Sequence, residues 1–191
     1  MKKICFIIAG SNGSGKTTIA KELINEFSLN FLNADEIAYK INPNDIDKIK
    51  ITAGKLFFVQ FKEYLKNEES FILETTLSGK YLEKYITLLK SQNYNIFLIY
   101  IFIDNPSVAI FRVKERVILG GHFVPDNDIK RRFFKSLKNF WNIYRFLVDE
   151  WKLIYNGECF TNIAKGSKKT YKIIDKTKFE NFISEVKYEK K

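Results

Sequence analysis

The stretch that decides the fold of this chain is Ile4-Cys-Phe-Ile-Ile-Ala-Gly10-Ser-Asn-Gly-Ser-Gly-Lys16-Thr17. Its first part, residues 4–9, is a continuous apolar run, which is typical of a parallel strand that is buried on both faces. Glycines then interrupt the run, and residues 15–27 have the pattern of a helix. The stretch therefore predicts a strand, a tight loop and a helix, in that order.

The glycines and the lysine of this stretch have the spacing G-x-x-x-x-G-K-[ST]. Between a buried strand and a helix, this spacing is specific to loops that bind nucleotide phosphates. Successive backbone N–H groups point inward in such a loop, and the helix adds the positive end of its dipole. The residues that we expect to hold a nucleoside triphosphate, ATP or GTP, are Gly10, Ser11, Asn12, Gly13, Ser14, Gly15, Lys16, Thr17 and Thr18.

Three residues at the end of the loop have individual roles. Lys16 is expected to bridge the β- and γ-phosphates, and the Thr17 hydroxyl to occupy one position of a Mg²⁺ ion. Thr18 is expected to face the α-phosphate or to pack. The alternative is a chance glycine-rich turn, and a true phosphate loop still leaves an ATPase, a GTPase and a kinase open.

Strands and helices alternate along the rest of the chain. We expect strands at 30–33, 71–73, 95–103, 153–155 and 172–174, and helices at 45–66, 80–91, 107–119 and 178–186. A further helix, capped by Asp126 or Asp128, has an apolar stripe made of Ile129, Phe133, Leu137, Phe140, Tyr144 and Leu147. The alternation predicts an α/β fold of the three-layer P-loop NTPase type, with a mostly parallel sheet and a helical lid.

The composition limits the class of protein further. At 191 residues with 46% apolar side chains, the chain is expected to form one domain over residues 1–191. Its 32 Lys and Arg against 22 Asp and Glu give a formal charge of +10, which favours anionic partners or forms a solvated basic surface. Cys5 and Cys159 have no spacing typical of a disulfide framework or a zinc site. No apolar run approaches the roughly 20 residues of a membrane span, so we expect a soluble, cytoplasmic protein.

Two acidic residues follow predicted strands, at the edge of the sheet where open α/β folds bind ligands. A carboxylate there can accept the proton of an acceptor hydroxyl or order Mg²⁺. Asp35, after the strand 30–33, is the candidate general base, unless it only caps a helix that begins at Glu36. Glu74, which ends the strand 71–73, is expected to be catalytic, to bind substrate or to organise magnesium.

A polar loop follows Glu74. Thr75, Thr76, Ser78 and Gly79 are suited to hydrogen bonds with a sugar or a nucleotide. Ser78 could instead cap the next helix.

Four arginines lie in or next to a candidate lid at about residues 107–135. Arg112 and Arg116 share a helix face, and Arg131 and Arg132 follow the possible hinge at Gly120-Gly121. Arg132 lies at the margin of the apolar stripe and is better placed to reach inward than Arg131, which lies on the polar side. We expect Arg116, with Arg131 or Arg132, to offset the charge of the migrating phosphoryl group. The alternative is that all four are solvated surface charges.

With these residues in hand, the chain resembles the short, stand-alone form of the zeta-toxin family of P-loop kinases. The similar segments are the loop from Gly10, Asn-Ala-Asp35-Glu, Glu74-Thr-Thr-Leu-Ser-Gly79, Arg116-Val, Gly-Gly-His-Phe-Val-Pro and Arg131-Arg132. They cover most of the chain. The resemblance implies a kinase that transfers the γ-phosphate of ATP or GTP to the sugar hydroxyl of a UDP-activated amino sugar such as UDP-N-acetylglucosamine.

The same resemblance implies roles for the residues identified above. Lys16 and Thr17 would hold phosphate and Mg²⁺, and Asp35 would deprotonate the sugar hydroxyl. Glu74 and Thr76 would contact the substrate. The phosphoryl group would be stabilised by Arg116 with Arg131 or Arg132. Members of the family often act as toxins that a small antitoxin restrains, and we expect any such antitoxin of this chain to act in trans.

Two other functions remain open. The positive charge and the aromatic-rich helix from Phe133 to Tyr144 allow a polynucleotide 5′-hydroxyl kinase or another RNA-directed kinase. Because these aromatic residues fall on one helical stripe, we expect them in the core and do not expect nucleic acid as the partner. The other function is that of a regulatory nucleotide-binding module without catalysis, in which replacement of Asp35 by Asn would leave the biological effect intact.

Overall fold

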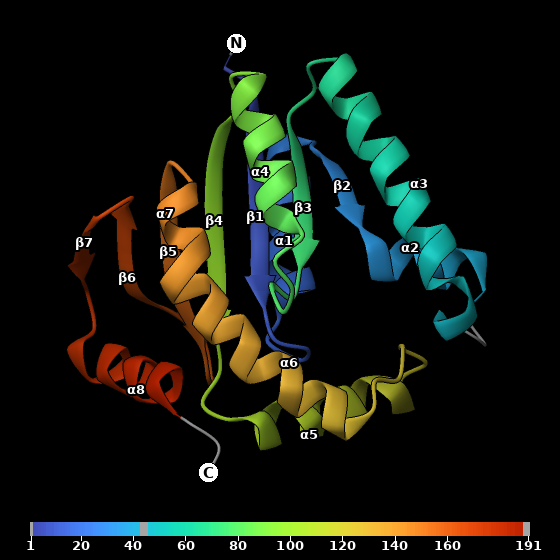
Figure 1. Ribbon diagram of the computed structural model, residues 1–191. Helices are drawn as coiled ribbons and strands as arrows, with labels where there is room; N and C mark the ends of the chain where they lie inside the picture. The colour runs from blue at the N-terminus through green and yellow to red at the C-terminus, as the bar shows by residue number, and fades with distance from the viewer. Residues whose placement is uncertain (1, 43–45, 189–191) are drawn as a thin grey trace.

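A seven-stranded sheet forms the centre of the structure, and helices lie on both of its faces (Figure 1). The computed structural model describes residues 2–42 and 46–188. The strand order is β2-β3-β1-β4-β5-β6-β7, parallel from β2 to β5 and antiparallel for β5–β6 and β6–β7. The strands are β1 (Ile4–Gly10), β2 (Asn30–Asn33), β3 (Phe71–Thr75), β4 (Asn95–Phe102), β5 (Glu150–Asn156), β6 (Phe160–Ser167) and β7 (Thr170–Ile173).

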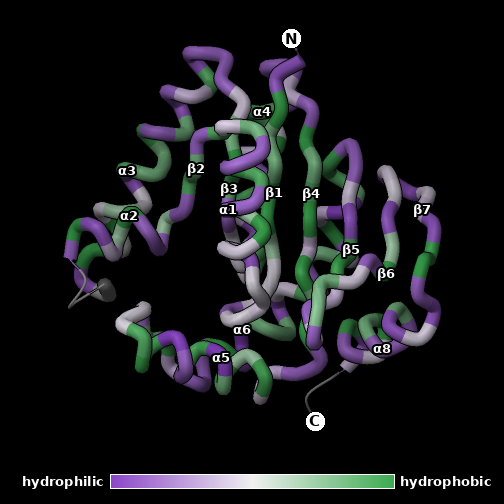
Figure 2. Tube along the Cα trace, turned by 180° about the vertical axis from the view of Figure 1, so that it is seen from behind, coloured by the Kyte–Doolittle hydropathy of each residue, from purple (hydrophilic) through white to green (hydrophobic). Residues whose placement is uncertain are grey.

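The helices divide between the two faces of the sheet. Among the helices within residues 2–42 and 46–188, α1 is the one that covers the first face, as the view from behind shows (Figure 2), and most of the others cover the opposite face or the end of the sheet. The helices are α1 (Lys16–Phe27), α2 (Ala34–Ile41), α3 (Ile46–Lys66), α4 (Leu82–Ser91), α5 (Pro106–Ile118), α6 (Asp126–Asn139), the π-helix η1 (Phe140–Tyr144), α7 (Arg145–Leu147) and α8 (Lys176–Lys187). In the described part of the chain, no helix has both the length and the apolar character that crossing a membrane requires.

Strand β1 is apolar throughout because both of its faces are covered. Cys5 and Ile7 are fully buried in the larger core, on the side of α4 and α6. Ile8 points to the other side and packs with Ile19 and Ala20 of α1. This burial explains the unbroken apolar run that precedes the glycine-rich loop.

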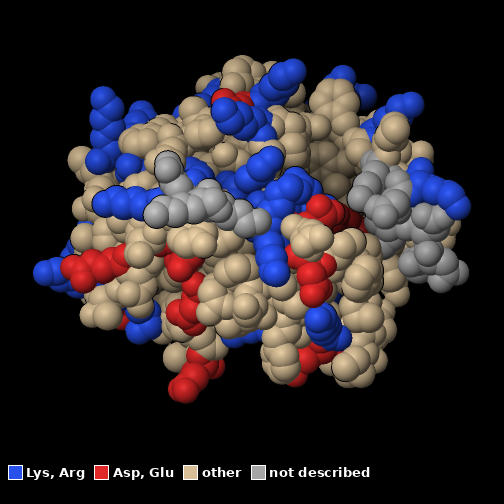
Figure 3. Space-filling view, turned by 60° about the horizontal axis from the view of Figure 1, so that its bottom comes forward, with Lys and Arg blue, Asp and Glu red and all other residues tan. Residues whose placement is uncertain are grey.

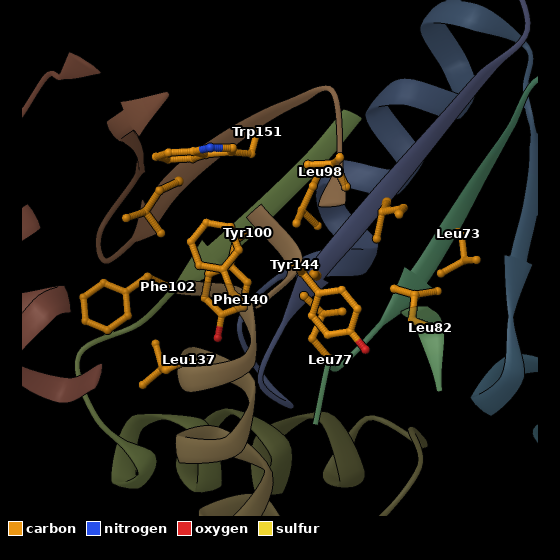
Figure 4. Close-up of a cluster of buried hydrophobic side chains, with 14 of the residues drawn as sticks. Leu73, Leu77, Leu82, Leu98, Tyr100, Phe102, Leu137, Phe140, Tyr144 and Trp151 are labelled. Atoms are coloured by element: carbon orange, nitrogen blue, oxygen red, sulfur yellow. The ribbon is translucent and has the colours of Figure 1, made fainter. Parts of the chain in front are cut away.

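The larger core ties helix α6 and the π-helix to the sheet (Figure 4). The ring of Phe140 stacks on that of Tyr100 of β4, with ring centroids 4.3 Å apart. The Tyr100 hydroxyl lies 2.8 Å from that of Ser136, and both side chains are buried. The Tyr144 hydroxyl donates to the backbone oxygen of Gly79 at 2.8 Å, which connects the helix to the loop after β3.

The predicted fold class is confirmed, and so are most of the predicted elements. The apolar stripe of the helix after Pro125 is buried from Ile129 to Tyr144, and Leu147 packs against the same core. The predicted caps of that helix were wrong: Pro125 occupies the N-cap position, and neither Asp126 nor Asp128 caps it.

Three other predictions need correction. Strand β3 does not end at Leu73 but continues through Glu74 to Thr75, because it pairs with both β1 and β2. Strand β6, residues Phe160–Ser167, was not predicted, because only Ile163 and Ala164 of it are buried and the strand lacks the apolar pattern of a buried strand. Helix α2, a short amphipathic segment of eight residues, was considered only as an alternative that begins at Glu36, and it begins at Ala34.

Helix α3 exists as predicted. Of its apolar residues, Phe57 and Phe61 are buried, whereas Leu56 and Val59 are exposed. The rings of Phe57 and Phe61 pack edge-on against Tyr85 of α4. The predicted first residue of the helix, Asp45, lies outside the described residues.

Candidate active site

A cleft of about 380 Å³ opens at the carboxyl ends of the strands, next to helix α6. It brings together eight residues that the sequence singled out, from four separate segments of the chain. They are Lys16, Asp35, Glu74, Thr75, Thr76, Ser78, Arg131 and Arg132. Asn33, Ala34 and Tyr81 complete the lining. On the face that includes α5 and α6, Lys and Arg side chains gather at the centre beside carboxylates (Figure 3).

The glycine-rich loop has a backbone that only glycine can form at two key positions. Gly10 has φ +148°, and a Cβ there would lie 2.6 Å from the Ser14 hydroxyl oxygen. Gly15 has φ +93°, and a Cβ there would overlap the Asn156 side chain. The loop therefore curls tightly before α1, in the conformation that phosphate binding requires.

Polar groups inside the loop are buried and lack an internal partner. Among the described residues, the side-chain oxygens of Asn12 and Ser14 are buried without a hydrogen bond. The Lys16 side chain is also buried, and its Nζ donates to the Ser11 backbone oxygen at 2.8 Å. Burial lowers the pKa of the Lys16 ammonium, and the carboxylates of Glu74 and Asp35 oppose this change. The unpartnered Ser14 hydroxyl can donate to a phosphate oxygen, so a loop with this hydroxyl beside a buried cation fits a bound polyphosphate.

The first residues of α1 lie at the mouth of the loop. The Thr17 hydroxyl donates to the Glu74 carboxylate at 3.0 Å. A hydroxyl and a carboxylate are oxygen ligands of the kind that Mg²⁺ takes in such sites, so this pair fits a magnesium ion bound with the triphosphate. Thr18 is exposed, which leaves it accessible to a phosphate rather than packed.

Asp35 lies in the first turn of α2 but does not cap it. The Asn33 side chain is the cap, and its Oδ1 accepts from the backbone N–H groups of Asp35 at 2.8 Å and Glu36 at 3.3 Å. The capping role considered for Asp35 is thus wrong, since the helix begins one residue before it. The Asp35 carboxylate is left exposed at the cleft that Lys16 also lines.

The polar loop after β3 is held in one shape by its neighbours. Leu77 is buried with φ +53°, and its N–H donates to the Thr75 hydroxyl at 3.2 Å. The Asn139 side chain donates to the Leu77 backbone oxygen at 2.7 Å. The hydroxyls of Thr76 and Ser78 lie 3.0 Å apart, and Ser78 does not cap α4, which begins four residues later. The loop therefore presents Thr76 and Ser78 to the cleft on a fixed frame.

Arg131 and Arg132 both line the cleft, but they differ in burial. The Arg131 side chain is 51% exposed and pairs with Asp128 at 2.8 Å. The Arg132 side chain is 20% exposed and lies 3.8 Å from the same carboxylate. Arg132 is the one that reaches further inward, as its position beside the apolar stripe predicted.

The other two arginines lie outside the cleft lining. Arg116 is exposed on α5, and its guanidinium donates to the His122 backbone oxygen at 2.7 Å. Its charge still acts on the Lys16 ammonium. Arg112, which the alternative made a solvated surface charge like the other three, donates to the backbone oxygens of Asn156 at 3.2 Å and Gly157 at 3.1 Å. Its Cβ lies beside Gly13, so Arg112 lies next to the phosphate loop.

Three residues near the site were missed by the sequence reasoning. Asn156 ends β5, and its side chain donates to the Ser14 backbone oxygen at 2.9 Å, so it braces the phosphate loop. The ring of Phe160 lies against Gly15. The Asn-Gly turn after a parallel strand was the available signal, because ligand sites gather at that edge. Tyr81, which lines the cleft, had no such signal because it follows the motif that ends at Gly79.

The sequence matches one family model, described as an AAA domain, over residues 6–131. An uncharacterized protein of Haemophilus influenzae is 31% identical over 134 residues, which are 70% of this chain and 94% of the relative. A cytidylate kinase of Saccharolobus islandicus is 31% identical over 91 residues, which are 43% of this chain and 48% of the kinase. The chain thus spans about half the length of the kinase that it matches.

Solved structures with a similar fold have low sequence identity. A chain of the AvrRxo1-ORF1:-ORF2 complex gives a TM-score of 0.73 at 17% identity, covering 95% of this chain and 63% of its own length. A chain from the PezAT chromosomal toxin-antitoxin system of Streptococcus pneumoniae gives 0.66 at 13% identity, covering 97% of this chain and 86% of its own. At these identities the likeness shows the fold, that of a P-loop NTPase.

Proposed function

We propose that this chain, which belongs to the AAA domain family, is a P-loop kinase. It phosphorylates a hydroxyl on the sugar of a UDP-activated amino sugar such as UDP-N-acetylglucosamine. The donor in this proposal is the γ-phosphate of ATP or GTP. The observation that carries the proposal is the single cleft that holds Lys16 together with Asp35, Glu74 and Arg132.

The donor triphosphate would lie along the phosphate loop. Backbone N–H groups of the loop and the buried Lys16 ammonium would hold the β- and γ-phosphates. The buried Ser14 hydroxyl, which has no partner within the loop, would donate to one of these phosphates. Arg112, held by the backbone after β5, would lie beside the nucleoside end of the donor.

Magnesium would be held beside the donor by Thr17 and Glu74, whose side chains already meet. When bound, the ion offsets charge on the β- and γ-phosphates. Glu74 would also position the Thr17 hydroxyl, which sets the first turn of α1 against the end of β3.

The acceptor would enter the open side of the cleft, where Asp35 lies exposed. The acceptor hydroxyl oxygen would form a bond to the γ-phosphorus while the bond from that phosphorus to the β–γ bridging oxygen breaks, and the diphosphate leaves. The hydroxyl proton would pass to the Asp35 carboxylate as the reaction proceeds. Thr76 and Ser78, on the fixed loop after β3, would hydrogen-bond the rest of the acceptor.

Arg132 is the arginine best placed to offset the charge of the migrating phosphoryl group. It is the less exposed of the pair on α6, and that helix is anchored to the sheet through Ser136 and Phe140. Arg116 would contribute only if residues around Gly120-Gly121 moved, since its guanidinium now binds the His122 backbone oxygen. We include that movement in the proposal, with residues 107–135 as the lid of a single domain.

A second candidate, a nucleoside monophosphate kinase, is favoured by the partial match to cytidylate kinase. Its acceptor is a phosphate, which needs no base and carries negative charge itself. The Asp35 carboxylate at the acceptor side of the cleft would repel such a group. The same carboxylate suits a neutral hydroxyl that must lose its proton, so we favour the sugar as acceptor.

We also propose that this chain acts as a toxin, a role that the shared fold alone does not imply. The likeness to the chain from the PezAT system extends over nearly the whole of this chain, which supports the idea. A small protein inhibitor acting in trans would be the corresponding partner.

The decisive experiment is a transfer assay with γ-labelled ATP and Mg²⁺. The acceptors are UDP-N-acetylglucosamine, CMP and an RNA with a 5′-hydroxyl, each supplied separately. We expect label in the nucleotide sugar and none after the Lys16→Ala substitution. Label in CMP would establish the second candidate, and label only in RNA would overturn both.

A pair of arginine variants tests the assignment within α6. Arg132→Ala is expected to lower kcat by about 100-fold or more, because it removes a cation from the reacting group. Arg131→Ala is expected to change kcat by less than about 10-fold, because that side chain is half exposed and paired with Asp128. Equal losses in the two variants would refute the assignment.

A further inference from the structure

Tyr81 is a residue of the cleft to which no motif assigns a role. It lies at the start of α4, between the polar loop after β3 and the helix. It lines the same cleft as Asp35, Glu74 and Arg132. The residue as a whole is 54% exposed, but its hydroxyl points inward to the Thr75 hydroxyl, where it is shielded from solvent.

Contacts at three points fix the ring of Tyr81. Its hydroxyl lies 3.3 Å from that of Thr75. The edge of the ring faces Tyr85, with centroids 6.2 Å apart and planes at 88°. The ring also lies against Gly79, where a Cβ would come within 3.0 Å of Tyr81 Cδ1. The ring is therefore pre-positioned at the cleft that it lines.

The hydroxyl of Tyr81 remains protonated at neutral pH. Burial raises the pKa of this phenol above its ordinary value, and the Asp35 carboxylate acts in the same direction, against the Thr75 hydrogen bond and Arg132. The group can therefore donate one hydrogen bond and accept others. The hydroxyl lies close enough to Asp35, the candidate base on the acceptor side of the cleft, for that carboxylate to affect its pKa.

We propose that Tyr81 is a substrate-binding residue: its ring carries the sugar ring of the acceptor, and its hydroxyl hydrogen-bonds a hydroxyl next to the one that Asp35 deprotonates. This inference rests on the proposed function and narrows the acceptor to a cyclic polyol. A fixed aromatic face suits the C–H face of such a ring, while Thr76 and Ser78 suit its hydroxyl edge. An acyclic or wholly anionic acceptor would leave the aromatic face unused.

The test uses two substitutions and a matched control on the same helix. Tyr81→Phe removes the hydroxyl alone, and Tyr81→Leu removes the aromatic ring. Tyr85→Phe is the control, because Tyr85 lies one turn away and packs among Phe57 and Phe61 outside the cleft. Binding of UDP-N-acetylglucosamine is measured by calorimetry with Mg²⁺ and a non-hydrolysable ATP analogue, and KM values are measured in the transfer assay.

We expect the Tyr81 substitutions to weaken binding of the acceptor and to leave binding of ATP unchanged. Tyr81→Phe should weaken UDP-N-acetylglucosamine binding about 3- to 10-fold, the value of one hydrogen bond, and Tyr81→Leu about 10- to 100-fold. The KM for ATP should stay within about twofold in both variants, and Tyr85→Phe should match the wild type. A purely structural role for Tyr81 would instead alter both KM values and the melting temperature together.

The other outcomes separate a failure of this inference from a failure of the proposed function. If the wild type binds the nucleotide sugar and Tyr81→Leu binds it equally well, this inference is wrong and the proposed function stands. If the wild type neither binds nor phosphorylates the nucleotide sugar, the proposed function fails and this inference fails with it. An equal loss of ATP affinity in Tyr81→Leu would assign the residue to the donor side and refute the proposal.

Discussion

Replacing Asp35 by Asn gives the sharpest test of the catalytic site, because the structure separates its chemical role from its structural one. The Asn33 side chain caps α2 and accepts from the backbone N–H groups of residues 35 and 36. The Asp35 carboxylate takes no part in that cap. The substitution therefore removes a charge from the cleft and leaves the helix start in place.

The expected effects on activity and stability differ greatly in size. Loss of a general base lowers kcat by about 10²- to 10⁴-fold, or about 3 to 5 kcal/mol of transition-state stabilisation. Loss of one negative charge in the first turn of an exposed helix costs about 0.3 to 1 kcal/mol of stability. For a chain of this size, that stability loss lowers the melting temperature by about 1 to 4 °C.

Glu36→Gln is the matched control. Glu36 follows Asp35 in the same first turn and forms an ion pair with Lys40 at 2.6 Å, but it does not line the cleft. Its substitution removes the same charge from the same end of α2. Transfer of labelled phosphate, ATP binding and thermal unfolding are measured for both variants.

We expect both variants to bind ATP and to lose similar, small amounts of stability, while only Asp35→Asn loses transfer. The reasoning is refuted if Asp35→Asn keeps more than about a third of the wild-type kcat, or if Glu36→Gln loses as much activity. If the Asp35→Asn protein no longer transfers phosphate but keeps its full biological effect, the result would instead favour a regulatory nucleotide-binding module.

Three further predictions concern the loop and the core. Gly15→Ala should weaken ATP binding at least about 10-fold, because the φ of Gly15 is +93° and Asn156 occupies the space that a Cβ would need. Gly54→Ala, where a Cβ would meet nothing within 4 Å, should raise stability by about 0.5 to 1 kcal/mol. Equal changes of the two variants in ATP affinity by calorimetry and in thermal unfolding would contradict this prediction. Tyr100→Phe and Ser136→Ala should each cost about 1 to 3 kcal/mol by stranding a buried hydroxyl, and the double variant should cost less than their sum in urea unfolding; additive losses would show that the pair is uncoupled. Burial raises the pKa of Tyr100 above its ordinary value of 10.0, so the unfolded state loses the phenol proton at a lower pH than the folded state. Stability should therefore fall as pH rises above about 10, and it should fall less steeply in Tyr100→Phe. An unchanged slope in that variant would show that Tyr100 does not cause the pH dependence.

Features that depend on neighbouring residues could be predicted from the sequence. The apolar run, the glycine spacing and Lys16 act within a few residues of one another, so the strand, the loop and α1 follow from local conformational rules. Asp35 and Glu74 could be placed at the edge of the sheet because parallel strands end together there. The apolar stripe of α6 was equally local, since it needs only the helical period.

Only the tertiary structure decided which side chains meet. Arg132 and Arg131 are neighbours in sequence, and their difference in exposure comes from how α6 packs on the sheet through Tyr100 and Phe140. Arg112 is held by backbone atoms more than 40 residues away. Tyr81 becomes part of the cleft because the loop before it is fixed from a distant helix. Contacts of this kind are set by packing over the whole core, which spacing along the chain does not encode.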